Sequence, residues 1–283
     1  MKVICAAAFV FLAPVAQAAT LVAGVQVISG SVGFRPDGSP VPVANFERAE
    51  VLDRLGTARM QGAASASGSY GAAGGSGEAS ADGVTGELKL VARAERSGAP
   101  SGQPESYASV WTEIRQDVVL NGTGYLRAHM LADVTWAGEG TQFTALTRIE
   151  GLGLGGSETD AFSVVGTDTP SGEILGRPLM ASIFVENARN VDVALDWAIW
   201  AIAVAGSEAD RVSTLVDASN TGRIFFSTSE GLSAVATTPG FLGDPAYVGE
   251  ISPVPLPASG LLLLGGAGVL ALARGRRKGA APA

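Results

Sequence analysis

The side chains able to support chemistry in this sequence are few, and most of them are acidic. The 283 residues contain one histidine, His129, and one cysteine, Cys5. A zinc site needs several histidine or cysteine ligands, and nucleophilic catalysis needs a serine or cysteine held beside a histidine. No G-x-S-x-G motif occurs in the chain. We therefore predict that the protein has no catalytic residues and is not an enzyme.

Several acidic residues gather in one loop-rich stretch. Carboxylate oxygens are the ligands that calcium prefers, but their spacing here does not match an EF-hand loop. A Gly-Gly-Ser-Gly-Glu run at 74–78 approaches a calcium-binding nonapeptide only once, with glutamate in place of aspartate. We predict no resident metal and no cofactor, with calcium as the alternative. The candidate calcium ligands are Glu158, Asp160, Asp168 and Glu173.

Two tryptophans lie close together in the apolar stretch Val191 to Val204. Trp197 and Trp200 could form a platform on which a sugar stacks. Being three residues apart, they would face opposite sides of a strand, so we predict core packing for them. His129 alternates with an apolar face in the same way, which puts it on the polar side of its strand as a solvated surface residue.

The elements that must position these residues are predicted to be strands. The chain has 38 glycines and only 6% aromatic residues, with no heptads or long amphipathic runs. Residues 87–95 alternate between an apolar face and a mainly polar one, as do Tyr107 to Leu120 and Leu126 to Val134. Period-two alternation of this kind is typical of half-buried antiparallel strands. We predict an all-β fold, an antiparallel β-sandwich of jelly-roll type.

Three stretches qualify that picture. Asn121-Gly122 separates two alternating runs and predicts a hairpin turn. Asn45 to Leu55 fits either a short helix or a strand. The small-residue stretch Gly62 to Gly83 fits either a mobile loop, because small residues bury little area, or a strand from Ala63 to Tyr70 followed by a glycine loop.

The charge balance restricts the partners. Five of the 19 basic residues lie in the two terminal segments, which contain none of the 27 acidic residues, so the central region carries a formal charge of −13. Nucleic acids and anionic lipids are bound through Lys/Arg patches. We therefore expect neither as a partner.

The N-terminus has the three parts of a secretory signal peptide. Lys2 supplies the positive charge and Val3 to Val15 the apolar run, and Ala16-Gln17-Ala18 is a small-x-small cleavage site. Cleavage after Ala18 or Ala19 would remove Cys5, so the mature chain would form no disulfide.

The last 30 residues also have three parts. A proline-containing motif is followed by an uncharged apolar run from Leu256 to Ala273, and a basic cluster comes last. Eighteen helical residues rise about 27 Å, close to the roughly 30 Å of a hydrocarbon core. The basic cluster fits the positive-inside rule, so the preceding chain should face outward. The motif is Val254, Pro255, Leu256, Pro257 and Ala258, and the cluster is Arg274, Arg276, Arg277 and Lys278.

This order resembles the PEP-CTERM sorting signals of Gram-negative bacteria, specifically the VPLPA-CTERM variant. Leu256 and Ala258 depart from the Pro-Glu-Pro pattern of the main family. The resemblance implies a membrane-anchored precursor in the inner membrane, processing by an exosortase-like enzyme, and transfer to the cell surface or extracellular matrix. A plain membrane anchor is the alternative, but Pro255 and Pro257 keep the approach extended, as a processing enzyme would need.

Together these features predict four segments: a signal peptide (1–19), a β-sandwich ectodomain (20–238), a Pro/Gly-rich spacer (239–253) and the sorting signal with its transmembrane helix (254–283). The main functional hypothesis is an exported surface or matrix protein with a structural or adhesive role, with exopolysaccharide as one partner. The alternative is a carbohydrate- or calcium-binding module with the same destination. A polysaccharide-active enzyme is a third hypothesis.

Overall fold

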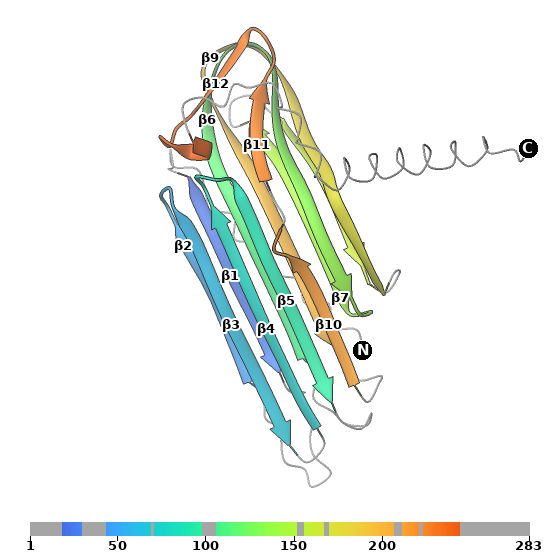
Figure 1. Ribbon diagram of the computed structural model, residues 1–283. Coiled ribbons are helices and arrows are strands. Elements are labelled where there is room, and N and C mark those ends of the chain that lie inside the picture. Colours follow the sequence, from blue (N-terminus) through green and yellow to red (C-terminus); the bar gives the residue numbers. More distant parts are fainter. Residues whose placement is uncertain are drawn as a thin grey trace, which may run out of the picture. The chain divides into compact units, whose positions relative to one another are not determined.

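The computed structural model describes residues 19–29, 44–68, 71–97, 106–151, 156–166, 170–206, 211–220 and 223–243. In these ranges the chain forms antiparallel strands and one short 3-10 helix, η1 (Figure 1). The strands are β1 (Thr20–Ser29), β2 (Ala44–Leu52), β3 (Thr57–Gly68), β4 (Gly71–Asp82), β5 (Glu87–Ser97), β6 (Ser106–Ala137), β7 (Thr141–Gly151), β8 (Ser157–Val165), β9 (Ser171–Ala205), β10 (Arg211–Ala218), β11 (Arg223–Thr228) and β12 (Leu232–Ala236), and η1 is Phe241–Gly243.

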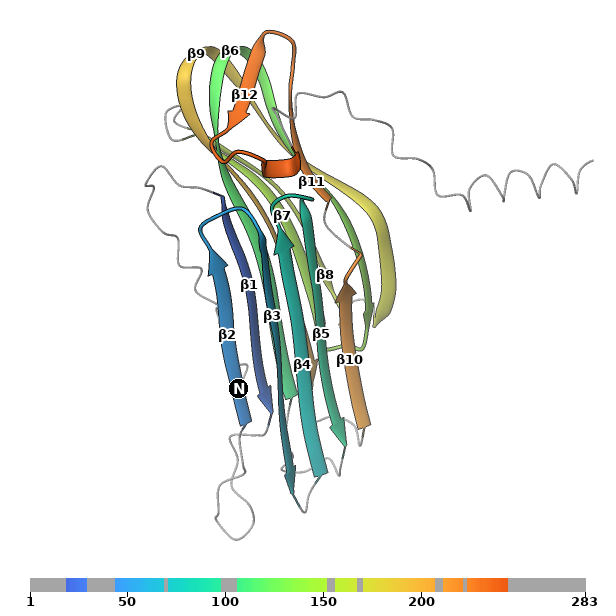
Figure 2. The ribbon, with the colours of Figure 1, turned by 60° about the vertical axis from the view of Figure 1, so that its left-hand side comes forward.

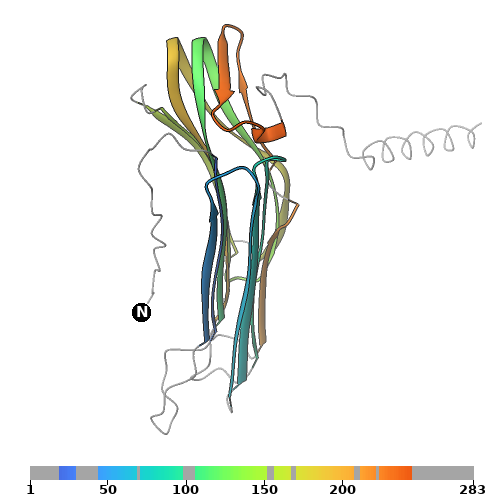
Figure 3. The ribbon, with the colours of Figure 1, turned by 90° about the vertical axis from the view of Figure 1, so that its left-hand side faces the viewer.

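The strands form two layers, which are visible in Figures 2 and 3. The first layer has the order β2-β1-β6-β9-β7-β8, and it uses the N-terminal half of β6 and the C-terminal half of β9. The second has the order β3-β4-β5-β10 and packs against β1, β2, β6 and β9. The prediction of an antiparallel all-β fold is confirmed, and the arrangement is consistent with a β-sandwich. Consecutive strands β3, β4 and β5 are neighbours in one layer, so this part is a meander and not a jelly-roll alternation.

The buried residues are those that the alternating pattern predicts. Every second residue of β5 and β6 faces the other layer, and the apolar side chains among them from Leu88 to Ala94 and from Val110 to Val134 are at most 1% exposed. The polar residues between them face outward, which is the arrangement that buries apolar area without burying charges. The confirmed core residues include Leu88, Leu90, Ala92, Ala94, Val110, Ile114, Val118, Leu120, Leu126, Ala128, Met130, Ala132 and Val134.

The small-residue stretch forms β3 and β4, so the mobile-loop hypothesis and the glycine loop are both wrong. Two glycines of β4, Gly75 and Gly77, lie where the opposite layer presents valines. A Cβ atom at Gly77 would lie 2.6 Å from Val110 and 2.7 Å from Val25. Glycine therefore allows the two layers to approach closely there. The valines of the opposite layer supply the apolar contact that the small residues of β4 cannot provide by themselves.

The predicted hairpin at Asn121-Gly122 is wrong, because β6 runs through it. The strand carries a bulge there, between two halves that belong to different layers. Gly122 has φ = 108°, and Asn187 and Asn190 on β9 have φ = 51° and 53°. The Asn190 N–H donates to Asn121 Oδ1 at 2.9 Å, and the Asn187 N–H donates to Thr123 Oγ1 at 2.9 Å. Residues that favour turns therefore form a β-bulge here, because a bulge needs positive φ just as a hairpin turn does.

The remaining boundaries differ by a few residues. The ambiguous stretch from Asn45 is strand β2, not a helix. The fold extends beyond residue 238, because Phe241 is 5% exposed and its ring stacks on Trp197 with a centroid distance of 6.2 Å. At the other end Ala19 is fully buried and its N–H donates to Thr238 Oγ1 at 2.6 Å.

Both terminal signals lie outside the described residues. These include the cleavage-site residues Ala16 and Ala18, the motif from Val254 to Ala258 and the basic cluster from Arg274 to Lys278. Within the described ranges there is no helix with the length and apolar character that a membrane crossing requires.

Candidate functional site

The outer face of the first layer, which points away from the second layer, carries two tryptophans side by side. Trp111 on β6 and Trp200 on β9 are directly paired across the antiparallel strands. Both are only half-buried, whereas the residues on either side of them along the strands, such as Val110 and Ala201, are buried in the core. Directly opposite residues have Cβ atoms about 4.5–5.5 Å apart, so the two indoles are adjacent.

A glycine provides the space for the first indole. Gly24 on β1 is the cross-strand partner of Trp111. A Cβ atom at Gly24 would lie 2.0 Å from Cε2 and 2.1 Å from Cζ2 of Trp111. The indole therefore lies across β1 on bare backbone, a position that any side chain at residue 24 would occupy. Aromatic side chains in other β-sheets pack over a cross-strand glycine in the same way.

The second indole leans in the same direction. Trp200 Nε1 donates a hydrogen bond of 2.9 Å to Ser109 Oγ on β6. Trp111 thus reaches from β6 onto β1, and Trp200 reaches from β9 onto β6. On the other side of Trp200 lies Thr144 of β7, whose hydroxyl is 2.9 Å from that of Ser163 on β8. The result is one row across five strands, two indoles followed by two hydroxyls, which we call the tryptophan row.

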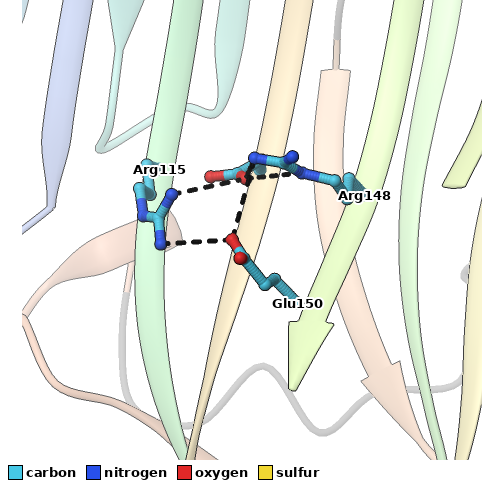
Figure 4. Close-up of polar contacts among 4 residues, drawn as sticks. Arg115, Arg148 and Glu150 are labelled. Carbon is cyan, nitrogen blue, oxygen red and sulfur yellow. Dashed lines mark hydrogen bonds and ion pairs between the residues drawn. The ribbon is translucent and has the colours of Figure 1, made fainter. Parts of the chain in front are cut away.

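A charged cluster lies four residues further along three of these strands, about 13 Å from the tryptophan row. Arg148 donates to Asp196 Oδ2 from Nε at 3.0 Å and from Nη2 at 2.5 Å. Arg115 lies between two carboxylates, 3.7 Å from Asp196 and 3.4 Å from Glu150 (Figure 4). These contacts connect β6, β9 and β7 on the open face.

The two arginines cover Asp196 almost completely. Its side chain is 3% exposed although it projects from the outer face, and its Oδ1 has no hydrogen-bond partner among the described residues. An ion pair in this position is costly to break, because removing one partner leaves a buried charge alone. We interpret the cluster as a support that fixes the strands beneath the tryptophan row.

Glu113 lies between the row and the cluster, two residues from Trp111 and two from Arg115. Burial raises the pKa of the Glu113 carboxyl above its usual range, and the nearby Asp196 charge raises it further, while Arg115 and Arg148 oppose both effects. Desolvation disfavours the ionised form, so the carboxylate is destabilised on this face at neutral pH.

This predicts a stability change for Glu113→Gln. Because the pKa of Glu113 is higher in the folded protein than in the unfolded chain, the wild type loses stability as the pH rises from the ordinary carboxyl range through the folded pKa. The variant has no such loss. We expect Glu113→Gln to melt at a higher temperature than the wild type at pH 7 and at nearly the same temperature at pH 4.

Thermal melts monitored by circular dichroism at both pH values measure this difference. Glu158→Gln, at an exposed carboxylate of β8, is the matched control and should leave the melting temperature unchanged. A lower melting temperature of Glu113→Gln at pH 7 would mean that Arg115 and Arg148 stabilise the ionised carboxylate more than burial penalises it.

The structure separates the two tryptophans that the sequence placed together. Trp197 is fully buried, so core packing is confirmed for it, but Trp200 lies on the outer face and core packing is wrong for that residue. Trp111 was missed. It shares the phase of Glu113 and Arg115, so an aromatic residue on a polar face was the signal that could have identified it.

The predicted solvated histidine is also corrected. His129 projects to the outer side of β6, as predicted, but it is only 8% exposed. β11 pairs beside it, and the Phe225 ring stacks on the imidazole with a centroid distance of 4.5 Å and an interplanar angle of 10°. Its Nε2 lies 3.0 Å from Ser227 Oγ. Burial lowers the pKa of His129, and Arg127 lowers it further.

The candidate calcium ligands do not form a cluster in the described part of the chain. Asp168 lies outside it, and among the residues that are described no group of three or more acidic, histidine or cysteine side chains is arranged to hold a metal ion. Asp160 accepts a hydrogen bond of 2.8 Å from the Met180 N–H instead.

Comparison with known proteins adds little. No protein family and no curated protein matches the sequence, so the C-terminal resemblance stays a prediction. Among solved structures, the carbohydrate-binding module TmCBM61, determined in complex with β-1,4-galactotriose, is 15% identical and aligns over 46% of this chain and 73% of its own. The TM-score is 0.20, which is too low to carry an argument about ligand or topology.

Proposed function

We propose that the protein binds polysaccharide through the tryptophan row and does so without chemical turnover. The observation that supports this is the pair of indoles that lean the same way on an open sheet face, one of them lying on Gly24. Sugar rings carry C–H groups that pack on aromatic faces and hydroxyls that hydrogen-bond to polar side chains. Thr144 and Ser163 continue the row with hydroxyls.

The platform is held in place before any ligand arrives. The Trp200 indole is fixed by its bond to Ser109, and the Trp111 indole by its position on β1. Little side-chain entropy is then lost on binding, which favours affinity. Because the row crosses the strands on an open face, it can bind sugar units in the interior of a long polysaccharide as well as at its end.

The carboxylates nearby are arranged for support and not for hydrolysis. Glycoside hydrolysis needs two accessible carboxylates on either side of the scissile bond. Glu113 lies beside the row, but the carboxylates of the cluster are ion-paired. Asp196 is 3% exposed and held by Arg115 and Arg148, and the more exposed Glu150 lies 3.4 Å from Arg115 and 3.8 Å from Arg148. A binding role therefore fits the face better than a catalytic one.

The terminal signals supply the destination in this proposal. An N-terminal signal peptide and a VPLPA-type C-terminal signal would deliver the chain across the inner membrane to an exosortase-like enzyme, and then to the surface or matrix. A polysaccharide-binding face would there give the protein an adhesive or structural role in an exopolysaccharide.

Affinity electrophoresis tests the proposal directly. The full chain, held in a detergent without a sugar headgroup, is run through native gels containing β-1,4-galactan, xylan or hydroxyethyl cellulose. We expect retardation by at least one of these neutral polysaccharides and no shortening of the polymer on size-exclusion chromatography. Unretarded migration in all three gels, or shortened polymer, would contradict the proposal.

A further inference from the structure

The C-terminal half of β6 carries a second outer surface of different composition. Beyond the bulge, β6 pairs with the N-terminal half of β9 on one side and with β11 on the other. The outward side chains form what we call the distal surface. It consists of Tyr125, Arg127 and His129 from β6, Met180, Ser182 and Phe184 from β9, and Phe225 and Ser227 from β11.

An aromatic pair is the most exposed part of the distal surface. Tyr125 and Phe184 are cross-strand partners, with ring centroids 5.1 Å apart in an edge-on arrangement. Tyr125 is 44% exposed and Phe184 is 56% exposed. Large aromatic side chains left open to water in this way are favourable sites for binding a ring or an apolar face.

An arginine that forms no ion pair among the described residues lies over the Tyr125 ring of this pair. The Arg127 guanidinium carbon is 5.2 Å from the centre of the Tyr125 ring. Arg115 and Arg148 on the first layer share carboxylates, whereas no ion pair to Arg127 is formed within the described ranges. Two carboxylates lie further along these strands. Asp133 of β6 accepts the Gly176 N–H, and Glu186 of β9 lies in the bulge of that strand.

The residues on either side of Arg127 are polar, and one of them is held in place. Its cross-strand partners are Ser182 on β9 and Ser227 on β11, and both present hydroxyls. Ser227 is fixed by His129, which is in turn stacked on Phe225. The guanidinium therefore has a hydroxyl on either side, one of them held in place, and has donors left over for a carboxylate, which arginine binds in a fork with two parallel hydrogen bonds.

We propose that the distal surface binds a carboxylated sugar unit, as found in uronic-acid polysaccharides. The sugar ring would stack on Tyr125 and Phe184, and the carboxylate would accept hydrogen bonds from the Arg127 guanidinium. The net charge of −8 opposes an anionic ligand at long range. At physiological ionic strength, however, charges more than about 8 Å away are largely screened, so local contacts decide binding.

This site is independent of the tryptophan row. Trp111 and Tyr125 are 14 residues apart on β6, on opposite sides of the bulge and in halves of the strand that belong to different layers. Two surfaces of different chemistry on one chain would let a single molecule connect a neutral and an acidic polysaccharide. Failure of one site would leave the other intact.

The test uses the full chain and two soluble probes, polygalacturonate and alginate, with methyl-esterified polygalacturonate as the neutral form of the same backbone. We expect binding of at least one probe, measured by affinity electrophoresis or calorimetry, and weakening by about tenfold or more in Arg127→Gln and in Tyr125→Ala/Phe184→Ala. Binding should also weaken in 0.5 M salt, because charges are screened.

Three controls make the result decisive. Arg93→Gln removes an exposed arginine from β5 and should bind as the wild type does, and Trp111→Ala/Trp200→Ala should retain uronate binding. Melting temperatures check that the surface variants fold. The proposal is overturned if neither probe binds, if the methyl ester binds equally well, or if the variants change only the oligomeric state on size-exclusion chromatography.

Discussion

Replacing Trp111 and Trp200 together with alanine is expected to abolish retardation by neutral polysaccharide while leaving the fold intact. Aromatic residues at the centre of a binding surface typically cost about 2 kcal/mol or more each when truncated, so the double variant should bind about 10³-fold more weakly. Both side chains are half-buried on an open face, so their removal leaves no core cavity. Affinity electrophoresis and thermal melts measure the two effects separately.

Two further variants make this result specific. Trp200→Phe keeps an aromatic face but loses the hydrogen bond to Ser109, so it should retain part of the affinity. Gly24→Ala leaves both indoles present but places a methyl group where the Trp111 ring lies, so it should weaken binding by moving the ring. If the double variant bound neutral polysaccharide as well as the wild type, the tryptophan row would not be the site.

Replacing Trp197 with alanine is expected to have the opposite profile. Trp197 is fully buried and stacks on Phe241, and truncating a large core aromatic residue typically costs about 3–5 kcal/mol. Urea unfolding should show this loss as a lower midpoint. Trp200→Ala, three residues further along β9, is the matched control because it removes the same atoms from the opposite face.

The contrast between these two tryptophans tests the assignment of the faces. We expect the free energy of unfolding to fall for Trp197→Ala, with polysaccharide binding retained below its unfolding transition. For Trp200→Ala we expect the reverse. Equal loss of stability in the two variants would show that the strand does not divide its side chains between core and binding face as described.

Local alternation was enough to predict the strands and much of the core. Leu88 to Ala94 and Leu126 to Val134 were identified because period two is a property of a few consecutive residues. The bulge at Asn121-Gly122 was not, because asparagine and glycine supply positive φ to turns and bulges alike, and only the pairing of β6 with β9 distinguishes the two.

The candidate sites depend on pairings between distant residues. Gly24 meets Trp111, and Trp111 meets Trp200, only through the register of β1, β6 and β9. Arg148 reaches Asp196 across 48 positions of sequence. No local pattern contains such contacts. The sequence shows that Trp111 lies on the same strand face as Glu113. It does not show that Trp200 would be the aromatic residue next to Trp111.

Small-residue strands were the other weak point. The stretch Gly71–Asp82 has almost no apolar volume, so its own composition favours a loop. It is a strand because Val25, Val27 and Val110 of the opposite layer fill the space that its glycines leave. The information that makes it a strand therefore lies in other segments.

The most direct test of the polysaccharide-binding face is a titration followed by the indole N–H resonances in two-dimensional NMR. The chain has four tryptophans, which are Trp111, Trp136, Trp197 and Trp200. On addition of the neutral oligosaccharide whose polymer retards the protein, we predict that the signals of Trp111 and Trp200 shift and saturate together. The signals of Trp136 and Trp197, which are buried, should stay in place. Saturable binding with the Trp111 and Trp200 signals unmoved would contradict the account.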